Sequence, residues 1–344
     1  MSTASSDTSN TSQRYVTHRI VPTERGDEIK ELFVNNERPE FPEWFDRAYP
    51  IAIEKLGATS WVTVDPGDRI ICHMAAFKAW FWVGDESVEG TLLCNLMTDR
   101  ESRSFFPTVA TIKRAVRDLR NDGTNFIYTN PINKGSIAVM RAGGLKKVGD
   151  ENRYLLPLGH DNWVKDFACN MHLRARSLGQ KRAVVSEVEP ERVVEWTAST
   201  QFCVSNVTSR RYPEVYFMRW NSLKGSETYG FEISDAKKGK KVGAALLRRS
   251  EKNPKEAALI TLRCVEAQDL APASLALGLE LRRRGFTRLN ATALEDSPFA
   301  EGLSRGGFIR RKEPWTIVAT AFTSEGQHVV DGLGSSDLEH IDVD

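Results

Sequence analysis

The chain has 344 residues, of which 40% are hydrophobic and 27% charged, and its formal net charge at pH 7 is +1. At about 100 to 200 residues per domain, this length predicts two domains. The near-neutral charge argues against a nucleic-acid partner, because proteins that bind nucleic acids usually carry a clear basic excess. No apolar run approaches the roughly 18 residues that span a bilayer, so we expect no membrane partner.

Cysteine and histidine patterns indicate the compartment and argue against a metal. The five cysteines include no CxxC pair, which favours free thiols in a reducing, cytoplasmic setting. The six histidines form no HxxxH or HxH pair, so we expect no metal cofactor. The segment from Met1 to Gln13 lacks the basic and apolar regions of a secretory signal.

Residues 15–158 predict a first domain, after a Ser/Thr/Asn-rich segment at 1–14 that we expect to be a disordered tail. Periodicity and turn residues predict helices at 27–35, 42–55, 106–121 and 136–142, and strands at 59–64, 69–83, 91–98, 126–129 and 154–158. Two helices, an antiparallel meander and then alternating strands and helices are typical of a mixed α/β layout.

The rest of the chain predicts a second domain between two less ordered regions. We expect a helical linker at 159–190, the domain itself at 191–322, and an acidic disordered tail at 323–344. The domain boundaries follow from an internal repeat. A helix that ends at Gly123 is followed by a strand, a helix and Gly143-Gly144, and the same order recurs from Gly285 to Gly306-Gly307. We therefore expect two related domains rather than one continuous sheet.

This order of elements resembles the GNAT superfamily of N-acyltransferases. Trp61–Asp65 with Arg69–His73 resembles its second and third strands, Leu93–Thr98 its fourth and Phe126–Pro131 its fifth. Gly144-Leu145 resembles the Gly-Phe that begins its sixth strand. The second half, through Gly307-Phe308, is similar to the companion domain of paired acyltransferases from surface-polysaccharide and amino-sugar pathways.

The resemblance implies a mixed α+β fold with two GNAT-like acyl-CoA N-acyltransferase domains in tandem. The first is the donor-binding candidate and the second is degenerate. Acetyl-CoA or another acyl-CoA would lie between the fourth and fifth strands, with its diphosphate at the start of the next helix. The donor contacts this implies are Leu96, Met97, Thr98, Arg103, Ser104, Phe105, Phe106, Thr108 and Asn130. The loop departs from the family's Arg-x-x-Gly-x-Gly/Ala pattern, because residues 100–108 contain no glycine.

Two residues are candidates for proton transfer. His73, in an apolar strand, has the residue type for a base near pH 7, and a hydrogen-bonded core histidine is the alternative. Tyr128 would lie beside the thioester as a proton donor, and a packed strand tyrosine is the alternative. The family's frequent acidic tyrosine is replaced by Met140 and, in the second half, by Leu303.

The acceptor implied is the primary amine of a small molecule such as an amino sugar, and the sequence leaves the oligomeric state open. Two other functions remain open at this stage. The same fold can take its acyl group from aminoacyl-tRNA or from acyl carrier protein. A non-catalytic tandem binding module is the alternative from another class, because the loop glycines and the family's tyrosine are missing.

Overall fold

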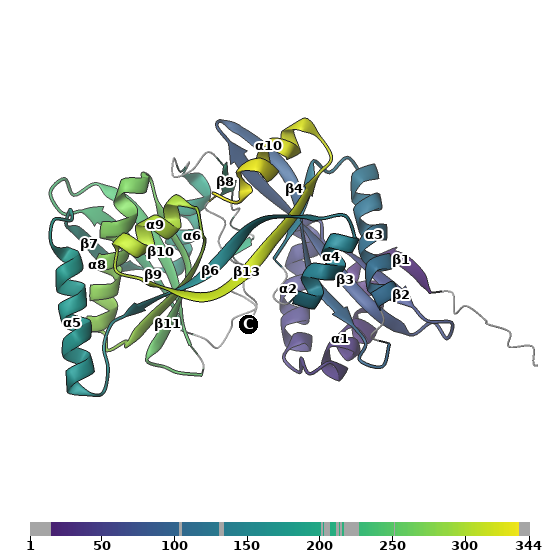
Figure 1. Cartoon of the computed structure of the whole chain (residues 1–344), viewed down its shortest axis with the longest axis horizontal. Helices are drawn as coiled ribbons and strands as arrows, with labels where there is room; N and C mark the ends of the chain where they lie inside the picture. The colour runs from purple at the N-terminus through teal and green to yellow at the C-terminus, as the bar shows by residue number, and fades with distance from the viewer. Residues whose placement is uncertain are drawn as a thin grey trace, which may run out of the picture.

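The computed structural model describes residues 15–102, 105–130, 134–200, 202, 207–210, 213, 215, 216, 227–250 and 252–336. The chain forms two halves that lie beside each other along its longest axis (Figure 1). The disorder predicted for residues 1–14 and 337–344 falls outside the described residues. So do the predicted donor contacts Arg103 and Ser104.

The first half follows the predicted order. Its elements are β1 (Val16–Ile20), η1 (Pro22–Arg25), α1 (Gly26–Asn35), α2 (Phe41–Leu56), β2 (Thr59–Val64), β3 (Ile70–Val83), β4 (Glu86–Thr98), α3 (Phe105–Asn121), β5 (Phe126–Thr129) and α4 (Lys134–Ala142). The bounds of β2 and β5 are those predicted. β4 begins earlier than predicted, because its hairpin with β3 stays in register as far as Val83 opposite Glu86.

The second half begins with β6 (Lys146–Pro157) and α5 (Trp163–Ser177). It differs from the predictions for the linker at 159–190 and for the tail from residue 323. Its further elements are β7 (Ala183–Val188), α6 (Pro190–Ser199), β8 (Val207–Arg210), β9 (Thr228–Asp235), β10 (Lys241–Arg249), β11 (Glu256–Cys264), η2 (Ala267–Asp269), α8 (Leu270–Arg283), β12 (Arg288–Leu294), α9 (Pro298–Arg305), β13 (Ile309–Ala321) and α10 (Ser324–Leu333). The helical linker predicted at 159–190 does contain the helix α5, but it also contains a strand, because β7 pairs with β9.

The acidic tail predicted from residue 323 contains the helix α10. Thr323 caps it by accepting a hydrogen bond from the backbone N–H of Gly326 at 3.1 Å. Val329 and Leu333 are fully buried on its inner face. The disorder was predicted from the number of acidic residues, and the apolar face was missed. Charges on the outer side of a helix do not prevent its inner side from packing.

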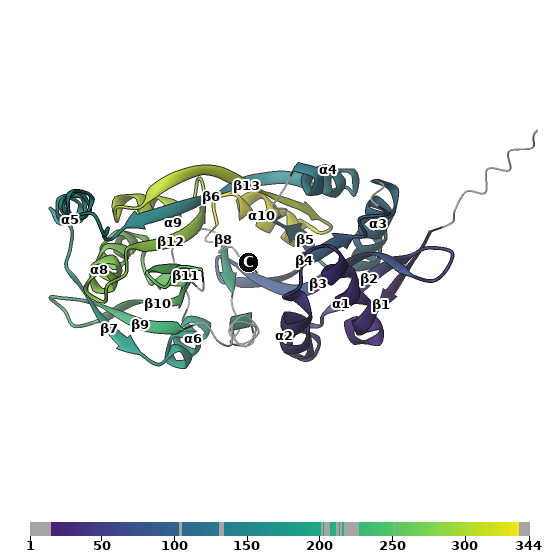
Figure 2. The ribbon, with the colours of Figure 1, turned by 90° about the horizontal axis from the view of Figure 1, so that it is seen from below.

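Among the described residues the strands form one sheet in the order β1-β2-β3-β4-β5-β13-β6-β12-β11-β10-β9-β7, and β8 pairs with β3. The expectation that the sheet would not be continuous is therefore wrong. The cause is an exchange of strands. β13 lies against β5, with Val318 opposite Thr129, and β6 lies against β12, with Leu156 opposite Leu289. Each half is completed by a strand that follows the other half in sequence (Figure 2).

The core of the first half lies on both faces of its sheet. On one face, α1 and α2 pack buried aromatic side chains such as Tyr49 and Phe45 against β2 and β3. On the other face, Ile112 of α3 packs with Trp61 and Leu93. The helix α10 covers a third cluster around Phe126, next to β5. Helices therefore pack on both faces of the part of the sheet that contains β4 and β5.

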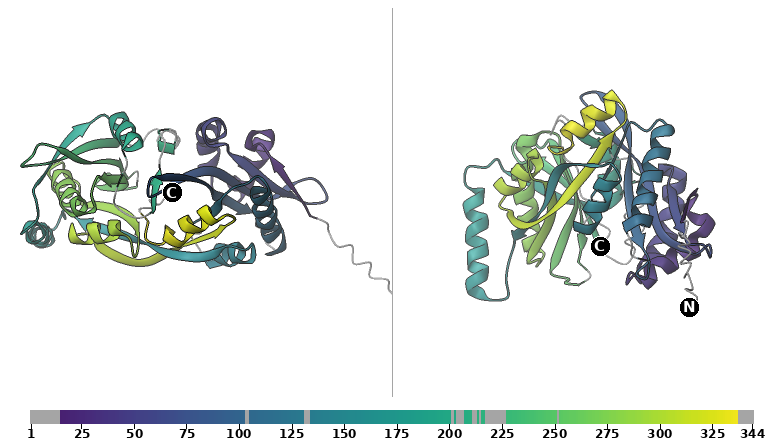
Figure 3. Two further views of the ribbon diagram at one scale, coloured as in Figure 1. Left: turned by 90° about the horizontal axis from the view of Figure 1, so that it is seen from above. Right: turned by 45° about the vertical axis from the view of Figure 1, so that its right-hand side comes forward.

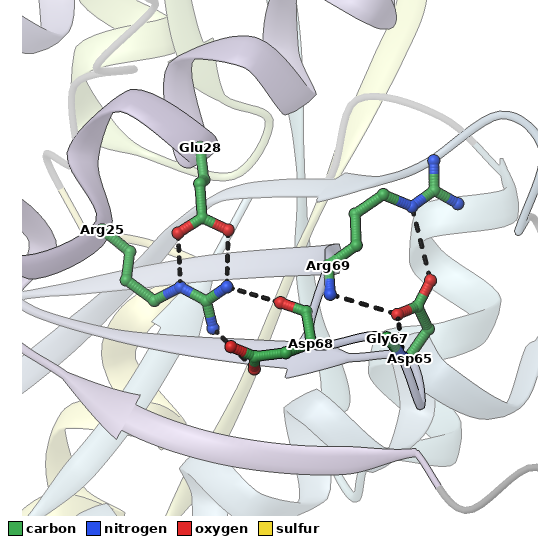
Figure 4. A network of polar contacts seen from close by, with 6 residues as sticks. All are labelled: Arg25, Glu28, Asp65, Gly67, Asp68 and Arg69. Carbon is green, nitrogen blue, oxygen red and sulfur yellow. Dashed lines mark hydrogen bonds and ion pairs between the residues drawn. The ribbon is translucent and has the colours of Figure 1, made fainter.

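A polar network fixes the turn between β2 and β3 (Figure 4). Asp65 Oδ1 accepts hydrogen bonds from the backbone N–H groups of Gly67 and Arg69, at 2.9 and 3.1 Å. Arg25 contacts the backbone oxygen of Asp68 at 2.6 Å and also pairs with Glu28. This network joins the start of α1 to the hairpin. Because its members are mostly exposed, each ion pair contributes less than about 1 kcal/mol.

Candidate active site

The main feature of the first half is the divergence of β4 from β5. The two parallel strands pair only at Thr91 with Ile127 and at Leu92 with Tyr128. Beyond this point β4 continues to Thr98 against β3, and β5 pairs on its other side with β13. The edge of β4 that faces β5 after Leu92 can therefore pair with an extended ligand, as the edge of a sheet does.

A bulge lies within the diverging part of β4. The register with β3 shifts between His73 opposite Met97 and Ala75 opposite Cys94. Asn95 has a φ of 52°, a left-handed conformation that asparagine tolerates better than most residues. Its side-chain Nδ2 donates to the hydroxyl of Tyr49 at 3.1 Å. The bulge changes the direction of the backbone at Leu96 and Met97, the predicted donor contacts.

His73 anchors this bulge from inside the protein. It is fully buried, its Nδ1 lies 3.0 Å from the carbonyl oxygen of Asn95, and its Nε2 lies 3.0 Å from Ser60 Oγ. A carbonyl only accepts, so Nδ1 carries the proton and Nε2 accepts from the serine hydroxyl. Burial lowers the pKa of His73 to about 4, against the opposing effect of its bond to Asn95. The geometry matches the core-histidine alternative rather than the predicted base, because both nitrogens are used within the chain.

Tyr128 lies where β4 and β5 separate. Its ring is 4% exposed and makes edge contact with Phe81 at a centroid distance of 5.5 Å. Phe126 stacks against it at 6.2 Å. These contacts agree with the alternative, a packed strand tyrosine. The role of Tyr128 as a proton donor stays a prediction.

The start of α3 differs from a glycine loop. Thr108 is buried, and its hydroxyl lies 2.9 Å from that of Thr98, so its side chain joins α3 to β4 rather than facing a phosphate. Phe105 and Phe106 are 51% and 77% exposed, and they project from the first turn. Arg100 pairs with Glu37 at 2.6 Å.

Glu151 is a buried acid that the sequence analysis did not single out. Asn130, directly after β5, donates a hydrogen bond from Nδ2 to Glu151 Oε2. Glu151 is 1% exposed on β6, between Leu294 of β12 and Trp315 of β13. The segment Asp150–Asn152 carries no local sign of this role, because the exchange of strands is what brings Glu151 to Asn130.

The second half repeats the strand geometry. β11 and β12 are parallel and pair from Glu256 with Arg288 to Ala258 with Asn290, after which β11 continues to Cys264. The register of β10 and β11 shifts between Leu246 and Leu247. The divergence of strands is thus present twice in the molecule.

The helix start in the second half is acidic and covered. Asp269 precedes α8, and its burial raises the pKa of its carboxyl. Gly302 of α9 and Gly306, directly after it, pack closely on the first turns of α8. A Cβ on Gly302 would lie 2.5 Å from Leu270 Cβ, and one on Gly306 would lie 2.0 Å from Ser274 Oγ. Both features disfavour a diphosphate there.

Over the part of the chain that the structure describes, no three His, Cys, Asp or Glu side chains gather in a way that could hold a metal ion. Within that same part, no helix combines the length and apolar character needed to cross a bilayer.

No family model matches the chain, and no curated protein matches it by sequence. Solved structures do match. A protein from Enterococcus faecalis described as a probable N-acyltransferase has a TM-score of 0.62 at 10% identity, over 91% of this chain and 74% of its own. A GCN5-related N-acetyltransferase from Anabaena variabilis has a TM-score of 0.62 at 11% identity, over 90% and 73%. A tandem GNAT protein from the clavulanic acid biosynthesis pathway has a TM-score of 0.55 at 12% identity, over 90% and 99%.

At such low identity these likenesses are likenesses of fold. The duplicated order of elements and the diverging strands in each half agree with them. The chain has the mixed α/β fold of GNAT proteins in its tandem form, as predicted.

Proposed function

We propose that the protein is an N-acyltransferase that moves an acyl group from acyl-CoA to a primary amine. The supporting observation is the divergence of β4 and β5 beside the bulge at Asn95. An extended pantetheine arm fits between the strands and pairs with the backbone from Leu96 to Thr98. The fold neighbours support the proposal, because two of those named above are described as N-acyltransferases or N-acetyltransferases.

In the proposed reaction the deprotonated amine attacks the thioester carbonyl. The new C–N bond forms, the C–S bond breaks, and the departing thiolate takes up a proton. Backbone N–H groups from Leu96 to Thr98 stabilise the oxyanion of the intermediate. Tyr128, at the point where the strands separate, is our proposed donor of the proton to the thiolate, and Tyr128→Phe tests it through the rate of the acylation step.

We assign Asn130 to donor binding and Glu151 to its positioning. Asn130 follows β5 on the diverging side, and its amide orientation is set by the bond to Glu151. The variant Asn130→Ala removes the amide, and we expect the KM for acyl-CoA to rise about tenfold, the scale of one hydrogen bond to a ligand.

Glu151 is tested by two substitutions. Glu151→Gln keeps an oxygen that accepts from Asn130, so we expect near-normal donor KM. Glu151→Leu removes that acceptor and should reproduce the Asn130→Ala effect. If Glu151→Gln instead abolishes kcat with KM unchanged, the carboxylate has a role in the chemical step and the positioning role is wrong.

The donor itself is tested by calorimetric titration of the intact protein with coenzyme A and acetyl-CoA. We expect one site per chain. Arg103, proposed as the guanidinium partner of the diphosphate, is tested with Arg103→Ala, which should weaken binding by about 1 to 3 kcal/mol. Absence of binding by the intact protein would exclude acyl-CoA as donor and leave either another donor, aminoacyl-tRNA or acyl carrier protein, or a non-catalytic binding module.

We propose a small amine as the acceptor, with amino sugars as the first class to examine. Release of free coenzyme A thiol is the readout, measured with amino sugars, nucleotide-linked amino sugars, amino acids and polyamines. Turnover with amino acids or polyamines alone would move the acceptor to another class of amine.

A non-catalytic tandem binding module is the second candidate. It is favoured by one observation, the exposed Phe106 at a position where the resemblance would place a small residue. Coenzyme A binding without thiol release for any amine would support this second function.

A further inference from the structure

Two arginines lie opposite each other on one face of the sheet, where the two halves join. β6 and β13 run side by side between the halves (Figures 1 and 3). In their register Arg153 of β6 is the partner of Arg311 of β13. On its other side Arg153 is the partner of Thr292 of β12. Directly opposite residues of an antiparallel pair share a face, so these three side chains form one row. We call Arg153 and Arg311 the arginine pair.

The arginine pair brings two positive charges together on neighbouring strands. Like charges directly opposite each other destabilise a sheet. Both side chains are exposed, and Arg311 forms no ion pair within the part of the chain that the structure describes. The preceding residue, Arg310, differs. It lies opposite Tyr154 on the other face and pairs with Glu295 at 2.5 Å. The arrangement of the arginine pair is thus one that a bound anion would stabilise.

An aromatic ring orients one member of the arginine pair. The guanidinium carbon of Arg153 lies 4.4 Å from the centre of the Trp315 ring. A ring contacts the flat face of a guanidinium, whereas a phosphate or a carboxylate binds along its N–H edge. The contact with Trp315 therefore fixes the plane of Arg153 without competing with an anion for the same atoms.

The arginine pair lies close to the proposed site of acyl transfer. Glu151, the register partner of Trp315, comes two residues before Arg153 on the same face of β6. At the rise of a strand, their backbones are about 7 Å apart. Glu151 also accepts the hydrogen bond from Asn130 at the end of β5. One face of β6 thus places a carboxylate toward the donor site and positive charge beyond it. This order of charges suits a molecule whose amine and anion are several bonds apart.

We propose that the arginine pair binds an anionic group of the acyl acceptor, a phosphate or a carboxylate several bonds away from the reacting amine. This inference rests on the proposed function and deepens it by assigning a charge to the acceptor. An α-amino acid carries its carboxylate on the same carbon as its amine, which is too close to reach both places. A polyamine has no anion to bind. Amino sugars that carry a phosphate match the spacing.

The test uses matched ligands that differ by one anionic group. Glucosamine and its phosphate ester at the sixth carbon share one amine, and aminopentanol and aminopentanoate, with the amine at the far end, share another. Calorimetric titration of the intact protein, with and without coenzyme A, measures their binding. We expect a charged member to bind about tenfold more tightly than its neutral partner, the scale of one charge-assisted contact. The pair of ligands that shows the difference identifies the group as phosphate or carboxylate.

Three variants connect this preference to the arginine pair. In Arg153→Gln/Arg311→Gln the charged and the neutral ligand should bind equally. Arg311→Lys keeps the charge but loses the planar fork of N–H donors, so it should retain part of the preference. Arg310→Gln is the matched control, because it removes an arginine of the same strand on the other face, and it should keep the preference. Equal thermal midpoints confirm that the variants are folded.

The inference is overturned by equal binding of the charged and neutral ligands to the wild type. It is also overturned by a preference that Arg153→Gln/Arg311→Gln keeps, or that Arg310→Gln abolishes to the same extent. The acyltransferase proposal is judged separately, by release of coenzyme A thiol. Binding that depends on the arginine pair without any thiol release would reject the transferase and keep the anion site. Thiol release with neutral and charged amines alike, at equal KM, would keep the transferase and reject the anion site.

Discussion

The two halves share their strand geometry and differ at the helix that follows it. β4 and β5 diverge after two paired residues, and β11 and β12 diverge after three. The helix α3 has no acidic residue in its first turn and exposes Phe105 and Phe106, whereas Asp269 and Glu266 precede α8. Diverging strands alone therefore do not identify a donor site. The charge at the helix start and the packing over it distinguish the halves, because a diphosphate needs exposed N–H groups without carboxylates nearby.

The bulges differ as well. In the first half, His73 and Tyr49 both contact Asn95, so the bulge is held by polar side chains from β3 and α2. In the second half, the shift in register falls beside Leu246 and Leu247, which are both buried and apolar. The first bulge is thus sensitive to protonation in a way that the second is not.

The largest effect that we expect comes from that sensitivity. The pKa of His73 is lowered from 6.5 to about 4, so the unfolded chain binds the proton more tightly than the folded chain. Its contribution to the free energy of unfolding is fully present above pH 6.5 and is lost as the pH falls toward 4. This amounts to about 3 kcal/mol. Urea unfolding of the wild type and of His73→Gln across this pH range should show that the wild type loses about 3 kcal/mol more. If the free energy of unfolding changes with pH in the same way in the wild type and in His73→Gln, protonation of His73 does not control the stability of the bulge.

A second prediction concerns the paired end of the strands. A Cβ on Gly90 would lie 2.3 Å from Phe126 Cζ, so Gly90→Ala should reduce the free energy of unfolding by about 2 kcal/mol through overpacking. The corresponding position of the second half is Glu256, which pairs with Arg288 at 3.0 Å near the surface. Glu256→Ala should cost less than about 1 kcal/mol. Thermal unfolding of both variants makes the comparison, and equal losses would show that close packing at Gly90 is not specific to the first half.

The smallest expected effect tests the role of charge at the helix start. Phe106→Asp gives α3 an acidic start like that of α8, and Phe106→Asn is its neutral control. Because Phe106 is 77% exposed, neither change should unfold the protein. We expect coenzyme A to bind Phe106→Asp about fivefold more weakly than Phe106→Asn, a cost of ~1 kcal/mol for a carboxylate near a phosphate in a solvated site. Equal affinities in calorimetry would mean that the close packing over the start of α8, and not its charge, distinguishes the halves.

Local patterns in the sequence predicted the elements but not their exchange. The bounds of β2 and β5 follow from short apolar runs between turn residues. The placement of β13 beside β5 depends on pairing between distant segments, which has no local signature. For the same reason the contact between Asn130 and Glu151 was not predicted.

Single side chains were harder to interpret than elements. The sequence marks His73 as a titratable residue in an apolar strand, which is compatible with a base and, more simply, with a hydrogen-bonded core residue. Only the positions of Ser60 and Asn95 distinguish the two. The segment of α5 was predicted only as part of a helical linker at 159–190, because periodicity alone does not tell which face of a helix turns outward.

The exchange of strands also sets the order in which the chain can be completed during synthesis. β5 emerges from the ribosome early, but its neighbour β13 ends at Ala321, close to the last described residue. Until then the edge of β5 is an unpaired template for other strands. A fragment that ends at residue 158 keeps this open edge permanently, and its own β6 lacks both neighbours, β12 and β13. The two halves therefore depend on each other for complete strand pairing, and β5 is covered on both edges only once β13 has been synthesised.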